Sequence, residues 1–189
     1  MSTLFAIVVV LVAVAAVVYA IWAAQRKRAG EAGGRRTLTN LRVGDIVRYR
    51  MMPECNFTVS GFIDYRENGY TWREVRLVDG KTVRWLGIEE EDFELELVLW
   101  REVDLGFSVS GRIPAELQFG GHTYRQEENG RAEAVLRGQT GNRQQLECSY
   151  WDYKEVGGER LLSIEQWGSD FEVSLGDRVR PGELDIFAP

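Results

Sequence analysis

From Leu41 onward the sequence consists of short runs in which apolar and polar residues alternate. The clearest run alternates aromatic or leucine with glutamate over residues 93–99, and a second covers residues 171–175. Such alternation places apolar side chains on one face of a strand and polar side chains on the other. No helical period longer than two turns occurs in this part of the chain. The sequence therefore predicts a mainly β fold.

Two-residue turn signals separate these runs, namely Asn68-Gly69, Asp79-Gly80, Asn129-Gly130 and Gly157-Gly158. Dipeptides of this kind tolerate the positive φ angles that tight hairpin turns require. Short strands separated by such turns predict an antiparallel sandwich or a partly open barrel.

One part of the sequence is echoed in another. The matching blocks are Trp72 with Trp151, residues 85–89 with 161–165, residues 92–95 with 170–173, and Tyr65-Arg66 with Tyr124-Arg125. A duplication would give two similar β-lobes, residues 38–104 and 105–189; alternatively, hairpins look alike because they share turn chemistry. Since lobes of about 70 residues are marginal alone, we expect them to share one core.

The N-terminal region contains a run of 21 uncharged residues, Leu4 to Ala24. At about 1.5 Å per residue, a helix of this length reaches about 30 Å, the thickness of the hydrocarbon core of a bilayer. A cleaved signal peptide would carry basic residues before the apolar run, whereas residues 1–3 are uncharged. The run therefore predicts a retained transmembrane helix over residues 4–24, through which the protein contacts the lipid bilayer.

Basic residues follow the predicted span: Arg26, Lys27, Arg28, Arg35 and Arg36. Because basic flanks stay in the cytoplasm, they predict a single-pass protein of the bacterial inner (plasma) membrane. Its N-terminus would lie outside and its C-terminal domain in the cytoplasm. Residues 25–37 form the basic, Gly-rich tether between the two.

The charge of the chain is divided unevenly. Residues 1–36 carry a net charge of +4 and the remaining residues a net charge of −10. An acidic body repels phosphate backbones, so we expect no nucleic-acid partner.

Few residues suggest chemistry, and we expect no catalytic residues, no metal, no cofactor and no enzymatic activity. Phosphate-binding, zinc-protease and nucleophile-elbow motifs are absent from the sequence. Cys55 and Cys148 are expected to be reduced and buried, and His122 to be exposed at a Gly120-Gly121 turn. The acidic run Glu89–Asp92 lacks the spacing of a calcium loop and is expected to be a solvated turn.

Several short motifs point to a known family. They are Leu41-x-x-Gly44-Asp45, Val59-x-Gly61, Gly69-Tyr70-x-Trp72-x-Glu74 and Arg84-Trp85-Leu86-x-x-Glu89. Over most of residues 38–189 the chain resembles the bacterial family catalogued as domain of unknown function 4178, although that family commonly has Tyr where this chain has Val75. The resemblance implies no catalytic residues. It implies a membrane-associated, multi-component system, because family members tend to be encoded beside small membrane proteins and polyamine-synthase-like enzymes.

Two functions of different classes fit the sequence. The first is a membrane-anchored protein-interaction or scaffolding module that binds a membrane or membrane-associated protein. The alternative is a sensor or carrier for a small cationic ligand such as a polyamine, in which Trp72 and Trp85 pack over the cation and Glu74 and Glu89 neutralise it. The competing interpretation of these tryptophans is that they fill the core. An enzyme ranks third.

Overall fold

The structure is a computed structural model that describes residues 36–91, 94–105, 112–141, 143 and 146–189. Within it, Thr37–Pro189 forms one compact unit. The predicted span (residues 4–24) and nearly all of the predicted tether, with Arg26, Lys27, Arg28 and Arg35, lie outside the described residues. No helix among the described residues is long and apolar enough to cross a membrane.

The described part of the chain contains eleven strands and two short 3-10 helices. In chain order they are η1 (Leu38–Asn40), β1 (Ile46–Tyr49), β2 (Phe57–Glu67), β3 (Tyr70–Asp79), β4 (Thr82–Glu91), β5 (Glu94–Glu102), β6 (Glu116–Phe119), β7 (His122–Gly138), β8 (Glu147–Glu155), β9 (Leu161–Trp167), β10 (Asp170–Val179), η2 (Pro181–Glu183) and β11 (Leu184–Phe187). The prediction of a mainly β, antiparallel fold is confirmed.

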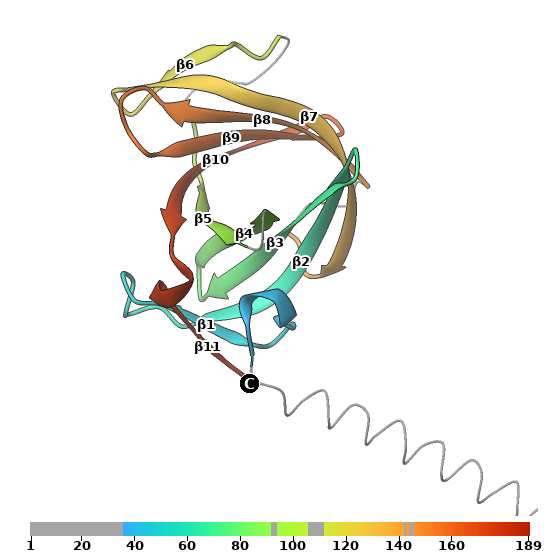
Figure 1. The fold of residues 1–189 in the computed structure, drawn as a ribbon, viewed down its shortest axis with the longest axis vertical. Helices are drawn as coiled ribbons and strands as arrows, with labels where there is room; N and C mark the ends of the chain where they lie inside the picture. Colours follow the sequence, from blue (N-terminus) through green and yellow to red (C-terminus); the bar gives the residue numbers. More distant parts are fainter. Residues whose placement is uncertain (1–35, 92–93, 106–111, 142, 144–145) are drawn as a thin grey trace, which may run out of the picture. The chain divides into compact units, whose positions relative to one another are not determined.

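Eight of the strands close into a barrel. Strands β2–β5 and β7–β10 each form a meander of four neighbouring strands, and the two meanders are joined by the pairs β5–β10 and β2–β7. Both joining pairs are antiparallel; Leu97–Glu102 pairs with Ser174–Val179, and Gly61–Arg66 with Glu133–Gly138. The barrel is therefore closed, and the predicted sandwich or partly open barrel is wrong on this point because both edges of each meander are paired. Figure 1 shows the two meanders facing each other.

Three of the four predicted turns connect strands. Asn68 and Gly69 have φ angles of 48° and 91° between β2 and β3, and Gly80 and Gly157 lie in the turns that follow β3 and β8. The prediction for Asn129-Gly130 is wrong, since both residues lie inside β7. A Cβ atom on Gly130 would come within 2.5 Å of the Glu67 carboxylate, so this glycine permits a close approach rather than a turn.

In an ordinary small barrel the apolar side chains of each strand point into the lumen. In the alternating runs of β5 and β10 the apolar side chains point outward instead. The leucines of β5 and the apolar residues of β10 pack in clusters outside the barrel, under β1, β11 and η1 on one side and beside β6 on the other. The polar faces of the same strands, with Glu96 on β5 and Glu172 on β10, turn inward. The alternation itself is confirmed, and its polar face lines the lumen.

The echoed blocks lie on strands at corresponding places in the two meanders. The blocks 85–89 and 161–165 fall on β4 and β9 with the same residues facing inward. Trp72 and Trp151 differ, because Trp72 lines the lumen and Trp151 packs in the outer cluster beside β6. The duplication stays a prediction.

Candidate functional site

The lumen of the barrel contains a cavity of about 580 Å³ that opens at one end. Eight carboxylates line it: Glu67, Glu74, Glu89, Glu91, Glu96, Glu128, Asp152 and Glu165. Among the described lining residues there is no Lys, Arg or His. A concave site lined by one sign of charge concentrates ions of the opposite sign, so this cavity favours cations.

The four residues singled out from the sequence lie in or beneath this cavity. Trp72, Glu74 and Glu89 line it, and Trp72 pairs with Glu89 across β3 and β4. Trp85 is 7% exposed and lies deeper, one step along β4 from Gly87 in the same inward-facing row. All four face the lumen, but Trp85 is buried there in an apolar cluster with Tyr65 and Trp167, against which Trp72 packs. The interpretation of these tryptophans as core residues is therefore confirmed for Trp85.

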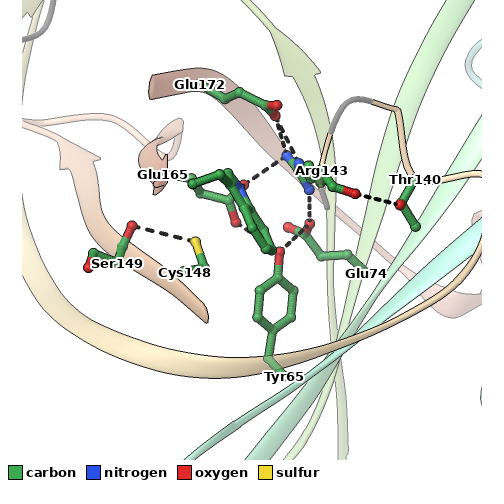
Figure 2. A network of polar contacts seen from close by, with 9 residues as sticks. Tyr65, Glu74, Thr140, Arg143, Cys148, Ser149, Glu165 and Glu172 are labelled. Atoms are coloured by element: carbon green, nitrogen blue, oxygen red, sulfur yellow. Dashed lines mark hydrogen bonds and ion pairs between the residues drawn. The ribbon is translucent and has the colours of Figure 1, made fainter. Parts of the chain in front are cut away.

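The inner end of the lumen holds a buried arginine, Arg143, whose side chain is 4% exposed. Its guanidinium donates to the Glu74 and Glu172 carboxylates at 2.7–3.0 Å and lies 2.8 Å from a Glu165 oxygen. Figure 2 shows the guanidinium pointing into the space between the three carboxylates.

Two indole rings complete the surroundings of Arg143. Its guanidinium carbon lies 4.2 Å from the centre of the Trp85 ring and 5.3 Å from that of Trp167. A cation over an aromatic face is stabilised by the ring quadrupole, more strongly where water is excluded. We refer to Glu74, Trp85, Glu165, Trp167 and Glu172 as the inner cage.

Close backbone packing brings Arg143 to the cage. After β7 the chain passes directly over β2, where the Gln139 amide donates to the Ser60 carbonyl at 2.8 Å. A Cβ on Gly61 would lie 2.3 Å from the Gln139 carbonyl oxygen, so only glycine fits there. The hydroxyl of buried Thr140 then donates to the Arg143 carbonyl at 3.2 Å.

The inner cage has more negative charge than Arg143 can neutralise, because three carboxylates share one guanidinium. Burial and the neighbouring Glu165 charge raise the pKa of Glu74 to about 8, against the opposing effect of Arg143. The Tyr65 hydroxyl lies 3.1 Å from Glu74 and 3.0 Å from Glu165. Near neutral pH Glu74 therefore holds a proton, which reduces the excess of carboxylate charge around Arg143.

Nearer the mouth lie three carboxylates that we call the outer carboxylates: Glu89, Glu128 and Asp152. None of them forms an ion pair with a Lys, Arg or His among the described residues. Burial, followed by the charges of Glu165, Glu128 and Glu89, raises the pKa of Asp152 to about 7, although a Ser163 hydrogen bond opposes the shift. Burial and the charges of Glu96, Glu91 and Glu128 also raise the pKa of Glu89. The outer carboxylates repel one another and, within the described ranges, have no ion-pair partner.

Aromatic rings form the wall between the inner cage and the outer carboxylates. Tyr65 stacks on Trp72 with ring centres 5.0 Å apart, and the Tyr150 ring meets Trp72 edge to face at 5.7 Å. The Tyr150 hydroxyl donates to Glu67 at 2.6 Å. These contacts fix the Trp72 ring at the lumen surface beside the outer carboxylates.

Sequence reasoning missed several residues of this site. The echo of Glu89 at Glu165 was a usable signal, since both residues face the lumen from equivalent strands. Asp152 gave no signal in a short strand rich in aromatic residues. Arg143 also gave none, because it lies outside any strand, between Asn142 and Gln144 in the sequence.

The acidic run was assigned incorrectly. Glu89, Glu90 and Glu91 belong to β4, which continues because Glu89–Glu91 pairs with Glu94–Glu96 of β5. Glu89 and Glu91 line the lumen, so the predicted solvated turn is wrong; Asp92 lies outside the described residues. No group of three or more His, Cys, Asp or Glu in the described ranges is arranged to hold a metal ion.

The remaining candidates lie as expected from their residue types. Cys55 and Cys148 are free and buried, as predicted. His122 begins β7 directly after the Gly120-Gly121 turn, and its 41% exposed ring lies 2.5 Å from Glu155. Arg36 is the first described residue.

Comparison with known proteins finds relatives without a described activity. The chain is 29% identical over 211 residues to an uncharacterized protein of Mycobacterium bovis and to uncharacterized proteins of two strains of Mycobacterium tuberculosis. Each match covers 99% of this chain and 97% of the relative. No solved structure matches the chain significantly.

The resemblance noted from the sequence motifs is confirmed by a family model. Its match covers residues 42–181, which include all eight strands of the barrel. The chain belongs to the family described as domain of unknown function DUF4178.

Proposed function

We propose that the barrel binds a small organic cation with more than one ammonium group, such as a polyamine, at the outer carboxylates. The observation that carries this proposal is that Glu89, Glu128 and Asp152, which have no ion-pair partner among the described residues, line one cavity with the rings of Trp72 and Tyr150. Carboxylates accept hydrogen bonds from ammonium groups, and aromatic faces attract the charged chain.

The spacing of the carboxylates favours an elongated ligand. Inward-facing residues on one strand are two positions apart, a rise of about 6.6 Å. Glu91 and Glu89 follow each other in this way on β4. Ammonium groups joined by short methylene chains have comparable separations, so a linear diamine or polyamine can meet successive carboxylates. The proposed role is binding rather than catalysis.

Titration calorimetry on the purified full-length chain tests this proposal. Spermidine and putrescine are expected to bind with one site, methylammonium more weakly, and Mg²⁺ without comparable heat. The matched control variants are Asp152→Asn in the lumen and Asp177→Asn on the exposed end of β10. Equal binding by both variants, or no heat with spermidine at millimolar concentration, would contradict the proposal.

Residues 4–24 would hold this barrel at the cytoplasmic face of a bacterial inner membrane. The support is the uncharged run itself and the basic residues that follow it. A C-terminal reporter that is active only in the cytoplasm is expected to be active. Activity of a reporter that works only outside the membrane would reverse the topology.

The second candidate function is a protein-interaction module. Exposed apolar side chains favour it: Val135 (54% exposed) and Leu146 (70% exposed) line one hollow, which Arg143 also borders. Purification of the full-length chain in mild detergent is expected to recover a stoichiometric membrane partner. Double substitution of Val135 and Leu146 by Ser should release that partner, and retention by the double variant would remove this surface as the contact.

A further inference from the structure

The inner cage encloses a cation with every element of a guanidinium-binding site. Three carboxylate groups meet the edge of the Arg143 guanidinium at 2.7–3.0 Å, and the Trp85 ring lies against its face at 4.2 Å. A guanidinium is planar, donates in a fixed fork and stacks on aromatic rings, whereas an ammonium is a strongly hydrated point charge. The inner cage therefore matches a guanidinium rather than an ammonium.

The cage belongs to the barrel and not to the segment that carries Arg143. Glu74 comes from β3, Trp85 from β4, Glu165 and Trp167 from β9, and Glu172 from β10. Glu165 is also held without Arg143, because the Trp167 indole donates to it at 3.1 Å. The Tyr65 hydroxyl lies between Glu165 and Glu74. A site held by rigid strands and neighbouring hydrogen bonds is preorganised for its occupant.

We propose that the inner end of the lumen is a binding site for guanidinium groups, which this chain fills with its own Arg143. The site itself does not depend on the cation-binding role of the outer carboxylates. One consequence does rest on that proposed function. Since Arg143 occupies the inner carboxylates, it limits an incoming ligand to the outer carboxylates and so restricts the length and charge of the ligand.

Chemical rescue of an Arg143→Ala variant tests the proposal. Thermal unfolding of the full-length chain is followed with methylguanidinium at millimolar concentration, with urea as the uncharged planar analogue and with sodium chloride at equal ionic strength. The variant is expected to melt at a lower temperature than wild type and to recover most of the lost Tm, saturably, with methylguanidinium alone. Wild type should not respond, because its site is full.

If Arg143→Ala is unfolded before any ligand is added, rescue is measured as refolding. Recovery of the tryptophan fluorescence of the folded chain on addition of methylguanidinium supports the site. No recovery and no rise in Tm, or an equal effect of urea, overturns it. This outcome is separate from the proposed function, which stands or falls on binding of spermidine by wild type.

An Arg143→Lys variant distinguishes a guanidinium site from a general cation site. Lysine keeps the positive charge but cannot make the planar fork or lie flat on Trp85. Its Tm is expected to lie between those of Arg143→Ala and wild type. A Tm equal to that of wild type would show that only charge matters and would overturn the assignment to guanidinium groups.

Discussion

The two ends of the lumen use the same residue types under opposite conditions. At the inner end, Glu74, Glu165 and Glu172 surround the Arg143 guanidinium in a buried cage. At the outer end, Glu89, Glu128 and Asp152 line the cavity and form no ion pair with a Lys, Arg or His among the described residues. The carboxylates of the inner end are paired with a cation of the protein, whereas those of the outer end have no ion-pair partner in the part of the chain that the structure describes.

The difference shows under which conditions this fold tolerates buried carboxylates. A buried carboxylate is costly unless it is paired or protonated, and the inner end satisfies this condition with a side chain of the protein. At the outer end burial raises the pKa of Asp152 to about 7, so this carboxyl keeps its proton to a higher pH than usual. A ligand cation would take the place of that proton.

The largest expected effect is on the free energy of unfolding, when Arg143 is replaced. Removing one partner of a buried ion-pair network leaves uncompensated charges, so Arg143→Ala is expected to lower the free energy of unfolding by about 3–5 kcal/mol. The matched control is Arg178→Ala, which breaks an ion pair with Glu96 whose side chains are 47% and 52% exposed. That loss should be about 0–1 kcal/mol. Urea denaturation measures the free energy of unfolding of both variants. Equal losses would show that the buried ion pairs of Arg143 stabilise the fold no more than an exposed ion pair does.

The second effect concerns ligand affinity at the outer end. Because Asp152 lines the cavity and pairs with Glu128 across β7 and β8, Asp152→Asn is expected to weaken spermidine binding about ten- to hundredfold, the value of a charge-assisted hydrogen bond. Its stability should not fall, since the variant removes a charge that has no partner. Calorimetry and denaturation of the same sample test the two parts. A stability loss as large as that of Arg143→Ala would identify Asp152 as structural.

Several strands and side chains of the two ends of the lumen could be predicted from the sequence. The alternation in residues 93–99 predicted the strand, and the Asn68-Gly69 turn predicted the hairpin that joins β2 and β3. The sequence also singled out Trp72, Glu74 and Glu89, which all line the cavity, whereas Trp85 lies in the buried apolar cluster. These predictions depend on local patterns, which a sequence displays directly.

The unpredicted features depend on which face of each strand is enclosed. Alternation marks a polar face on β5 and β10, but it cannot say that this face turns into a lumen instead of outward to solvent. Trp72 and Trp151 look equivalent in the sequence, yet the first lines the lumen and the second lies outside it. The position of Arg143 follows from contact between Gly61 and Gln139, residues 78 positions apart in the chain.

The third effect is a dependence of stability on pH. The pKa of Asp152 is raised from 3.8 to about 7 in the folded chain, so between these values the folded state keeps a proton that the unfolded state has lost. Stability is therefore greatest at acid pH and falls as the pH rises toward 7, by at most about 1.4 kcal/mol per pH unit for one proton. Asp152→Asn should flatten this fall, and saturating spermidine should oppose it. An unchanged pH profile in the variant would show that Asp152 is ionised throughout.

The smallest effect tests the aromatic wall of the outer end. Trp72 offers its ring beside the outer carboxylates, and a cation at a partly exposed ring gains about 0.5–1 kcal/mol. Trp72→Leu is thus expected to weaken spermidine binding about two- to fivefold. The matched control is Trp151→Leu, which changes the echoed tryptophan in the outer cluster and should leave affinity unchanged while costing stability. If both variants lower affinity alike, the loss reflects a general loosening of the barrel; a loss confined to Trp72 separates the ligand-facing wall from its structural counterpart.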